Sequence, residues 1–248
     1  MTSLNDRPVA LVTGGGTGIG KSTVIKLAKR GYRVAINFSK SRDDANNTLS
    51  EIVSVGGEGL IIQGNVGNSD DVRSMIETVV SAWGRIDVLV CNAGTTHFVN
   101  YPELDLLTDD VWNDIIQVNV LGTFYCVKAC MPFLIQSKGS IVLVTSVAGI
   151  TGLGSSIPYS VSKGALNTLT KSLAKTFGPS VRVNAVAPGP VLTRWLEGHE
   201  ERVSDYLKQT PLGKACSADD VADTIVYLAI ETNLTTGQIL VVDGGRTM

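Results

Sequence analysis

Residues 8–38 read PVALVTGGGTGIGKSTVIKLAKRGYRVAINF, and this stretch decides the fold. Its first five residues form a short apolar run that is typical of a buried strand. A glycine-rich turn occupies 13–20, and residues 21–30 then place Val24, Leu27 and Ala28 on one helical face. Gly31 ends that helix, and residues 32–38 read as a second strand. The order strand, glycine turn, helix, strand is the context that a dinucleotide site requires.

The glycines of this turn are spaced GxxxGxG, at Gly14, Gly18 and Gly20. Glycine lets the backbone come close to a pyrophosphate, and the amino terminus of the next helix favours its negative charge. A glycine-rich turn without a ligand is the alternative, and it is the less frequent outcome in this context. The sequence therefore predicts a dinucleotide site at the turn.

Strand and helix patterns alternate along the rest of the chain. Strands are expected near 8–13, 32–38, 59–64, 86–91, 139–145, 181–187 and 238–242. Helices are expected near 18–30, 43–55, 69–83, 109–136 (broken), 157–177, 194–208 and 217–230. This rhythm predicts an α/β fold with a doubly wound, seven-stranded parallel sheet and helices on both faces. The length of 248 residues and the absence of a composition break predict a single domain over 1–248.

Three polar residues after the apolar run at Val142 can together move a proton onto a carbonyl oxygen. Ser146 follows that run, Pro158 suits the first turn of a helix, and Tyr159 and Lys163 share one face of that helix. A free tyrosine has a pKa of about 10, and a nearby ammonium lowers it. Such a phenol serves as a general acid or base, while a serine hydroxyl holds the reacting oxygen. A tyrosine and a lysine on a solvated helix face are the alternative, and a YxxxK alone favours it.

Several short motifs stand in one order along nearly the whole chain. They are Thr13-Gly-x-x-x-Gly-Ile-Gly20, Asn92-Ala93-Gly94, Asn119, Ser146, Tyr159-x-x-x-Lys163, Arg182-Val183-Asn184 and Pro188-Gly189. In these motifs, from about Val9 to Gly245, the chain resembles the short-chain dehydrogenase/reductase family. Each motif is weak alone. Their combination in this order favours a catalytic role for the tyrosine and the lysine over a place on a solvated helix face.

The resemblance implies roles for four catalytic residues. Tyr159 would be the general acid/base, and Ser146 would orient the substrate carbonyl. Lys163 would lower the pKa of Tyr159 and bind the nicotinamide ribose, and the backbone of Asn119 would support a water-linked proton relay. The implied activity is that of an NAD(P)-dependent oxidoreductase, which transfers a hydride between nicotinamide and a carbonyl or secondary alcohol. No metal is expected.

The resemblance also implies a set of cofactor-binding residues, which come from the turn and the ends of successive strands. They are Gly14, Thr17, Gly18, Ile19, Gly20, Phe38, Ser39, Lys40, Asn65, Val66, Asn92, Ala93, Gly94, Tyr159, Lys163, Pro188, Gly189, Val191 and Thr193. Two positions depart from the family pattern. Asn65 stands where many members have an aspartate that meets the adenine amino group. Thr17 stands where NADP-dependent relatives often have Arg or Lys.

We expect NADP as the cofactor, with NAD as the alternative. An NAD site usually has an acid at the end of the second strand to bind the ribose 2′-hydroxyl, and Phe38 holds that position here. Lys40 and Arg42 follow closely and can donate to a 2′-phosphate. Asp43 or Asp44 is the counter-candidate for the acid, but both suit the amino end of the next helix.

Three functions remain open from the sequence. The first is a reductase of free carbonyls or alcohols, and the second is a 3-oxoacyl-[acyl-carrier-protein] reductase. Such reductases tend to carry a basic strip before the serine strand, where only Lys138 stands here. The third is a non-catalytic dinucleotide sensor on the same fold, but a sensor has little reason to keep Ser146, Tyr159 and Lys163 together.

Charge and composition exclude other classes. The net charge of -2 argues against a nucleic-acid partner. The uncharged segment 139–162 is rich in Gly, Ser, Thr and Pro in its second half, so no membrane span is expected. The polar residues 1–7 do not read as a signal peptide, and the four cysteines lack zinc spacing. Buried thiols in a cytoplasmic protein are the simplest account, and His97 reads more readily as a loop residue than as a pocket residue.

The resemblance further implies a homotetramer, in which the helices 109–136 and 157–177 pair across a two-fold axis. Phe124, Val127, Leu166 and Leu173 are candidates for the apolar contact, with packing against the sheet as the alternative. Residues 190–212 alternate apolar and charged side chains, which suits either a substrate lid or an ordinary surface helix.

Overall fold

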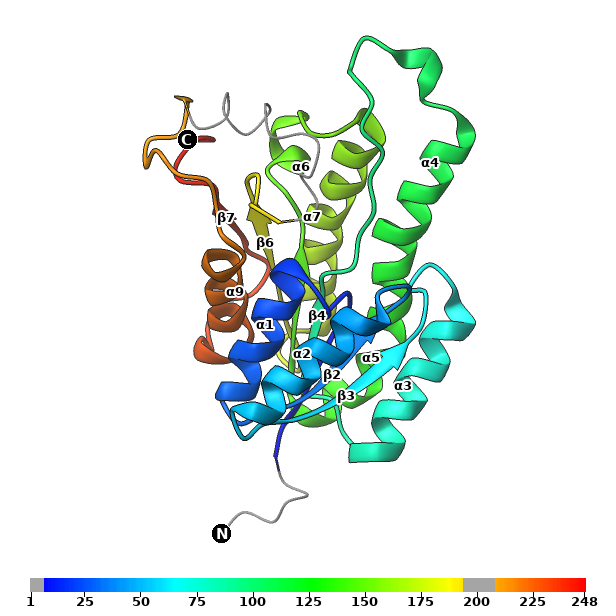
Figure 1. The fold of residues 1–248 in the computed structure, drawn as a ribbon, viewed down its shortest axis with the longest axis vertical. Coiled ribbons are helices and arrows are strands. Elements are labelled where there is room, and N and C mark those ends of the chain that lie inside the picture. Colours follow the sequence, from blue (N-terminus) through cyan, green and yellow to red (C-terminus); the bar gives the residue numbers. More distant parts are fainter. Residues whose placement is uncertain (1–6, 194–207) are drawn as a thin grey trace.

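The computed structural model describes residues 7–193 and 208–248. Within them, seven parallel strands form one sheet in the order β3-β2-β1-β4-β5-β6-β7 (Figure 1). The strands are β1 Val9–Val12, β2 Arg33–Phe38, β3 Glu58–Gln63, β4 Val88–Cys91, β5 Ser140–Val144, β6 Arg182–Pro188 and β7 Ile239–Val242. The α/β doubly wound fold predicted from the sequence is confirmed.

Helices cover both faces of the sheet. They are α1 Gly18–Lys29, α2 Arg42–Ser54, α3 Ser69–Trp83, α4 Asp109–Ile116, α5 Thr123–Ser137, α6 Ala148–Thr151, α7 Ile157–Phe177 and α9 Ala218–Val226, with the 3-10 turn η2 Leu104–Leu106 and the π-helical turns η3 Gln117–Gly122 and η5 Tyr227–Glu231. Side chains of α1, α2 and α9 join one apolar cluster, and those of α3, α5 and α7 join the other. Residues 194–207 lie outside the described part, and so does most of the expected lid.

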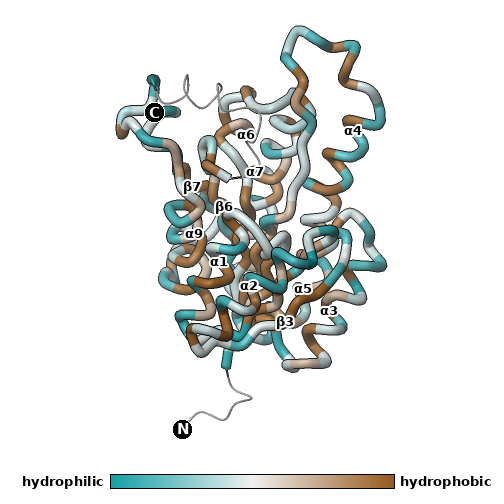
Figure 2. The backbone as a smooth tube through the Cα atoms, viewed as in Figure 1, coloured by the Kyte–Doolittle hydropathy of each residue, from teal (hydrophilic) through white to brown (hydrophobic). Residues whose placement is uncertain are grey.

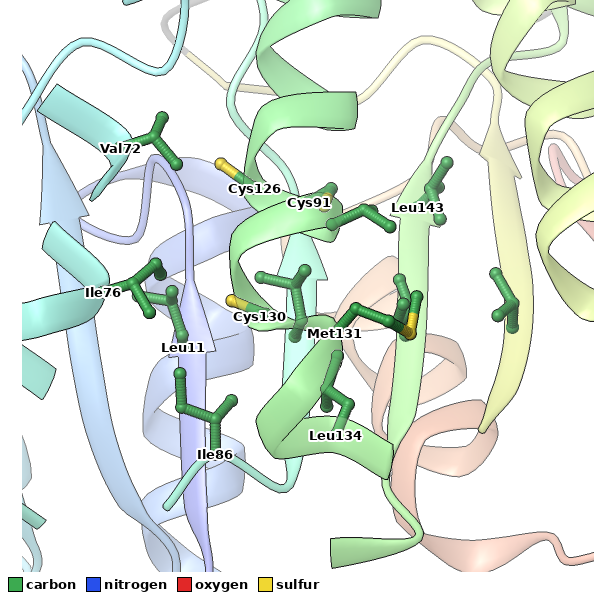
Figure 3. Close-up of a cluster of buried hydrophobic side chains, with 14 of the residues drawn as sticks. Leu11, Val72, Ile76, Ile86, Cys91, Cys126, Cys130, Met131, Leu134 and Leu143 are labelled. Atoms are coloured by element: carbon green, nitrogen blue, oxygen red, sulfur yellow. The ribbon is translucent and has the colours of Figure 1, made fainter. Parts of the chain in front are cut away.

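The central strands β1 and β4 are apolar and buried along their whole length, because helices cover both faces of the sheet there. Along β1, Leu11 points into the cluster of α3, α5 and α7, while Val12 points into the cluster of α1, α2 and α9. Figure 3 shows the first cluster, where Cys126, Cys130 and Met131 of α5 lie over the strands. The backbone coloured by hydropathy shows apolar segments concentrated in the sheet layer and on the inner sides of the helices (Figure 2).

Local signals account for several helix boundaries. The side chain of Asn68 accepts hydrogen bonds from the first-turn amides of α3, and Gly84 ends that helix in the left-handed region with φ 74°. Asp43 and Asp44 lie in the first turn of α2, as the sequence predicted. The helices expected at 69–83 and 157–177 have those bounds in the structure.

The helix expected at 109–136 runs without a break from Asp109 to Ser137, and in place of the predicted break the π-helical turn η3 interrupts its α-helical pattern. Gly122 of this turn packs on the loop after β3, where an added Cβ would lie 2.9 Å from Val66 Cγ2 and 3.0 Å from the Val66 carbonyl oxygen. A side chain at Gly122 would therefore separate η3 from that loop. The short elements η2 and α6 were not predicted.

The continuous helical run Asp109–Ser137 is long and apolar enough to cross a membrane by length and composition alone. Core helices of soluble proteins pass the same test, and Cys126, Cys130 and Leu134 of this run are buried in the core. Packing against the sheet accounts for the apolar character of the run.

One part of the interface prediction is wrong. Val127, Leu166 and Leu173 are buried in the core cluster of α3, α5 and α7, because they face the sheet. Phe124 is exposed, as an interface residue would be in an isolated chain. The other exposed large apolar residues on η3, α5 and α7 are Leu121, Ile135 and Val161.

Candidate active site

The predicted site residues gather at the carboxyl ends of the central strands. β1 pairs with β2 on one side and with β4 on the other, so the strand order reverses at β1. Ligands of open α/β sheets bind in the crevice at such a reversal point. The glycine turn follows β1, Asn92 to Gly94 follow β4, and Ser146 follows β5.

The glycine turn adopts backbone conformations that need glycine. Gly14 and Gly18 have φ of 61° and 53°, in the left-handed region. Gly20 lies in the first turn of α1, where an added Cβ would lie 2.6 Å from Asn92 Nδ2 and 2.9 Å from the Gly14 carbonyl carbon. Glycine at position 20 thus lets α1 start directly against the glycine turn, so the amino terminus of α1 points at the site where a phosphate was predicted.

Side chains that the sequence analysis did not single out hold the turn in place. Thr13 Oγ1 accepts from the amides of Asn92 and Ala93, each at 3.0 Å. Asn37 is buried in β2, and its Oδ1 accepts from Gly14 N at 3.2 Å while its Nδ2 donates to Gly64 O at 3.0 Å. The signal for Asn37 was present, because an amide within an otherwise apolar strand requires buried partners.

The side chain of Asn92 is committed to the turn as well. Its Nδ2 donates to Thr13 O at 2.9 Å and to Gly14 O at 3.1 Å. Both amide hydrogens therefore point at the protein backbone. Asn92 shapes the loop that would receive a dinucleotide, and its amide group is not turned toward a ligand.

Ser146, Tyr159 and Lys163 come together as the sequence predicted. Ser146 lies just beyond β5, and its hydroxyl forms a side-chain hydrogen bond with Tyr159. Lys163 is buried one turn further along α7, with Nζ 5.6 Å from the centroid of the Tyr159 ring. Lys163 Nζ donates to Val144 O at 2.9 Å, which fixes the ammonium at the end of β5.

The pKa values of this group differ from the sequence expectation. Desolvation raises the pKa of Tyr159 to about 12, and the hydrogen bond with Ser146 opposes this rise only in part. Desolvation lowers the pKa of Lys163 to about 8. The sequence predicted that the Lys163 ammonium would lower the pKa of Tyr159; burial raises that pKa instead, and the hydrogen bond with Ser146 is what opposes the rise. In this state Tyr159 carries its proton at neutral pH and is ready to donate it.

Asn119 lies in η3 and is fully buried. Its Nδ2 donates to Thr95 O and to Ser162 Oγ, both at 3.0 Å, and its Oδ1 accepts from Thr95 N at 2.8 Å. Ser162 directly precedes Lys163 on α7, so Asn119 joins the loop after β4 to the helix that holds the tyrosine. An added Cβ on Gly94 would lie 3.2 Å from Asn119 Oδ1 and 3.7 Å from Lys163 Nζ, so these three positions are adjacent.

The end of β2 presents basic side chains. Phe38 is buried, and the Arg42 guanidinium lies over its ring at 5.1 Å from the centroid. Arg42 also donates to Gln63 Oε1 at 2.8 Å. Ser39 and Lys40 are exposed at the same corner. The ring of Phe38 therefore supports the Arg42 guanidinium. The exposed polar groups at this corner belong to Ser39 and Lys40.

The loop after β3 places Asn65 on the surface and Val66 in the core. Asn65 Oδ1 accepts from Gly67 N at 3.0 Å, and Asn65 N donates to Asp71 Oδ2 at 2.9 Å. The side-chain amide oxygen of Asn65 thus closes a local turn at this position.

The segment after β6 returns to the glycine turn. Gly189 N donates to Val242 O at 2.8 Å, and Val147 N donates to Pro188 O at 3.0 Å. Val191 is buried and forms a bridge with Cys216. The side chain of Thr193 lies beside Gly18, where an added Cβ would be 3.3 Å from Thr193 Cγ2.

These positions fit a dinucleotide. An open groove of ≈ 670 Å³ starts at the turn and runs along the outer face of α1, and it does not reach Asn92, Ser146 or Tyr159. Its lining includes Gly16, Thr17, Gly18, Lys21, Leu192 and Thr193. The first amides of α1 have no partners within the helix and face this end, which suits a pyrophosphate. Ile19 is partly buried against the core cluster of α1, α2 and α9.

His97 and the four thiols were not expected to take part in this chemistry. His97 Nε2 pairs with Asp114 Oδ2 at 2.8 Å on the exposed surface. All four cysteines are free and buried, as predicted. Among the described residues, no group of three or more His, Cys, Asp or Glu side chains is placed to hold a metal ion.

Known proteins resemble this chain over almost its full length. The sequence model of the family described as Enoyl-(Acyl carrier protein) reductase matches residues 14–247. A Streptomyces violaceoruber protein described as a ketoacyl reductase of the granaticin polyketide synthase is 41% identical, with 98% of each chain covered. A 3-oxoacyl-[acyl-carrier-protein] reductase of Synechocystis is 38% identical over 100% of both chains. A Burkholderia xenovorans crystal structure described as a short-chain dehydrogenase/reductase matches with TM-score 0.92, 34% identity and 98% coverage of each chain.

Proposed function

This chain belongs to the short-chain dehydrogenase/reductase family, and we propose from that premise that Tyr159 is the general acid/base of its reaction. The protein is an oxidoreductase of the NAD(P)-dependent class that acts on carbonyl groups. The observation that carries the proposal is the hydrogen bond between Tyr159 and Ser146 beside the buried Lys163.

Ser146 and Tyr159 act on the same oxygen of the substrate. The Ser146 hydroxyl donates to the carbonyl oxygen and keeps it within reach of Tyr159. A reduced nicotinamide, when bound, supplies the hydride that the carbonyl carbon accepts. Negative charge then grows on the oxygen, and Tyr159 passes its phenolic proton to it, which gives the secondary alcohol. In the oxidative direction Tyr159 takes that proton back.

Lys163 and Asn119 maintain this proton transfer. The Lys163 ammonium, held by Val144 O at 2.9 Å, stabilises the phenolate that remains after each transfer. It also has donors for the ribose hydroxyls of a cofactor. The backbone of Asn119, in a π-helical turn that disturbs the usual carbonyl pairing, supports a water-linked path that returns a proton to Lys163 and Tyr159.

The cofactor is NADPH in this proposal. The turn from Gly14 to Gly20 holds the pyrophosphate, and Ser39, Lys40 and Arg42 donate to the 2′-phosphate. Stacking on Phe38 positions the Arg42 guanidinium at this corner. The two acids that would favour NAD, Asp43 and Asp44, are used at the amino end of α2.

The remaining cofactor contacts follow the ends of the strands. Asn65 and Val66 would flank the adenine, and the backbone of Asn92, Ala93 and Gly94 would line the adenosine side. Pro188, Gly189, Val191 and Thr193 hold the carboxamide end. The proximity of Thr193 to Gly18 supports this assignment, because it brings the segment after β6 to the mouth of the phosphate turn.

A 3-oxoacyl thioester is the substrate class that the relatives favour. Two similar proteins are described as ketoacyl and 3-oxoacyl-[acyl-carrier-protein] reductases. The weak basic strip at Lys138 does not count against this substrate, because Lys138 precedes the first residue of β5 and Ser146 follows the last. Lys138 and Ser146 therefore lie at opposite ends of β5. Free ketones and secondary alcohols are the second class.

The assay follows NADPH oxidation with four substrates: one 3-oxoacyl chain on an acyl carrier protein, the same chain on coenzyme A, a free 3-oxoester and a simple ketone. We expect turnover with the thioesters, and a preference for the carrier protein identifies the partner. In Tyr159→Phe the phenyl ring still packs, but turnover falls by about 10²–10⁴ while cofactor binding persists. Retention of more than half of the wild-type kcat would contradict the role of Tyr159.

The assembly is a homotetramer in the cytoplasm in this proposal. Leu121, Phe124 and Val161 on η3, α5 and α7 are exposed apolar residues in the isolated chain. A two-fold contact between these helices would bury them against their symmetry copies. The predicted absence of nucleic-acid and membrane partners stays part of this proposal.

A further inference from the structure

Two loops of the active-site end and the first turn of α7 meet at one phenol. The hydroxyl of Tyr101 contacts Gly152 O at 2.8 Å, Gly154 N at 2.7 Å and Ser160 Oγ at 2.8 Å. Tyr101 comes from the loop between β4 and α4, while Gly152 and Gly154 belong to the loop between α6 and α7. Ser160 lies in the first turn of α7, directly after Tyr159.

The capacity of this hydroxyl matches its contacts. A phenol has one hydrogen to donate and two lone pairs that accept. It donates to Gly152 O, accepts from Gly154 N and shares a hydrogen bond with Ser160 Oγ in which either hydroxyl can be the donor. Ser160 has Ser156 O as a second acceptor at 3.2 Å. Tyr101 therefore holds the loop 152–156 at both of its glycines.

The loop that Tyr101 holds lies against the ring of Tyr159. An added Cβ on Gly154 would lie 3.2 Å from Tyr159 Cδ1, 3.1 Å from Ser160 Oγ and 2.8 Å from Ala148 Cβ. Gly154 thus fits between α6 and the tyrosine ring with no room for a side chain. Any shift of Gly154 changes the surface on which that ring rests.

The same two loops have further links that do not involve Tyr101. Thr96 Oγ1 lies 2.5 Å from Ser155 Oγ, and Val99 N donates to Ser155 O at 3.0 Å. These links keep the loops together when the phenol is lost. The loss of the Tyr101 hydroxyl is therefore expected to move Gly154 within a folded protein, not to unfold it.

We propose that Tyr101 is a positioning residue, which sets the ring of Tyr159 for proton transfer by holding Gly154 against it. The inference rests on the proposed role of Tyr159 as general acid/base. Tyr101 acts through Gly154 and the first turn of α7, and it does not itself touch the reacting atoms.

The test compares Tyr101→Phe with Tyr227→Phe. Tyr227 lies on η5 and is exposed, so its variant controls for the loss of a hydroxyl elsewhere. We expect Tyr101→Phe to lower kcat about tenfold, since small misplacements of a catalytic group are costly. The Kd of NADPH, measured by fluorescence titration, stays within about twofold. A kcat within about twofold of wild type would overturn the proposal.

A double variant separates positioning from a general structural effect. In a Tyr159→Phe background there is no phenolic proton to position, so Tyr101→Phe should leave the residual rate unchanged. The same tenfold loss in that background means that Tyr101 acts independently of Tyr159, and it refutes the inference. Should Tyr159→Phe alone keep its activity, the proposed function fails, which is a different outcome.

Gly154→Ala tests the same contact without touching Tyr101. Its Cβ would push on the Tyr159 ring, so kcat should fall while the Kd of NADPH holds. If Tyr101→Phe does not fold, this variant decides, and a wild-type kcat in Gly154→Ala overturns the proposal. Where both fold, their effects on kcat combine less than multiplicatively, because they act on one contact.

Discussion

Replacement of Gly20 by alanine should destabilise the protein although alanine is the better helix former. The added Cβ would lie inside van der Waals contact with the Gly14 carbonyl and 2.6 Å from Asn92 Nδ2. Either α1 or the turn must then move. The movement breaks the hydrogen bonds of Asn92 to Thr13 O and Gly14 O, at 2.9 and 3.1 Å.

The magnitude follows from these contacts. Two partly buried hydrogen bonds contribute about 1 kcal/mol each, and overpacking adds about 1–3 kcal/mol. The helix propensity of alanine offsets at most about 1 kcal/mol. The net loss in unfolding free energy is about 3 kcal/mol, which lowers the Tm by about 6–12 °C for a chain of this size.

Gly164→Ala is the matched control. Gly164 also lies in a helix, but an added Cβ there would meet only Gly149 O, at an ordinary 3.5 Å. The substitution should therefore raise the Tm by about 1–4 °C. Differential scanning calorimetry of both variants tests the pair. A Tm for Gly20→Ala at or above wild type would refute the contact argument for the phosphate turn.

Three further predictions concern the cofactor, the buried lysine and the assembly. Lys40→Ala/Arg42→Ala should lower kcat/KM for NADPH at least about tenfold and leave kcat/KM for NADH unchanged. A tenfold preference of the wild type for NADH would contradict the assignment of the residues after β2 to a 2′-phosphate. Burial lowers the pKa of Lys163 from 10.5 to about 8. Between these two pKa values the unfolded chain binds more protons at Lys163 than the folded chain does. The unfolding free energy therefore rises with pH over this range. The unfolding free energy of wild type relative to Lys163→Met, from urea titrations at pH 7, 8 and 9, should therefore increase with pH, and a constant difference would contradict the assignment. Phe124→Asp/Val161→Asp should lower the mass measured by light scattering, whereas an unchanged tetramer would place the interface elsewhere.

Local sequence signals were sufficient for most elements of the fold. Pro158 marked the start of α7, and Asp43 and Asp44 marked the start of α2. The Asn68 cap and the left-handed Gly84, which the structure shows at the ends of α3, are local features of the same kind. Such signals act within one turn of the chain, so they can be read without knowledge of the fold. The YxxxK spacing belongs to the same class, since a helix puts residues four apart on one face.

The directions of side chains on long apolar helices were less predictable. Val127, Leu166 and Leu173 face the sheet, while Phe124 and Val161 face outward. Helices α5 and α7 are apolar over much of their circumference, so the sequence pattern does not identify a single buried face. Packing against the strands makes that selection.

The sequence by itself determined the strand and helix order, the parallel sheet and the residues that could perform proton transfer. The tertiary structure decided how those residues behave. Asn92 and Thr13 are 79 positions apart, and they meet because β1 pairs with β4. The pKa of Tyr159 rises through desolvation by the groups packed around it, and Gly154, from a separate loop, is one of its neighbours. Desolvation depends on every group that surrounds a side chain, and those groups come from segments that no local pattern connects.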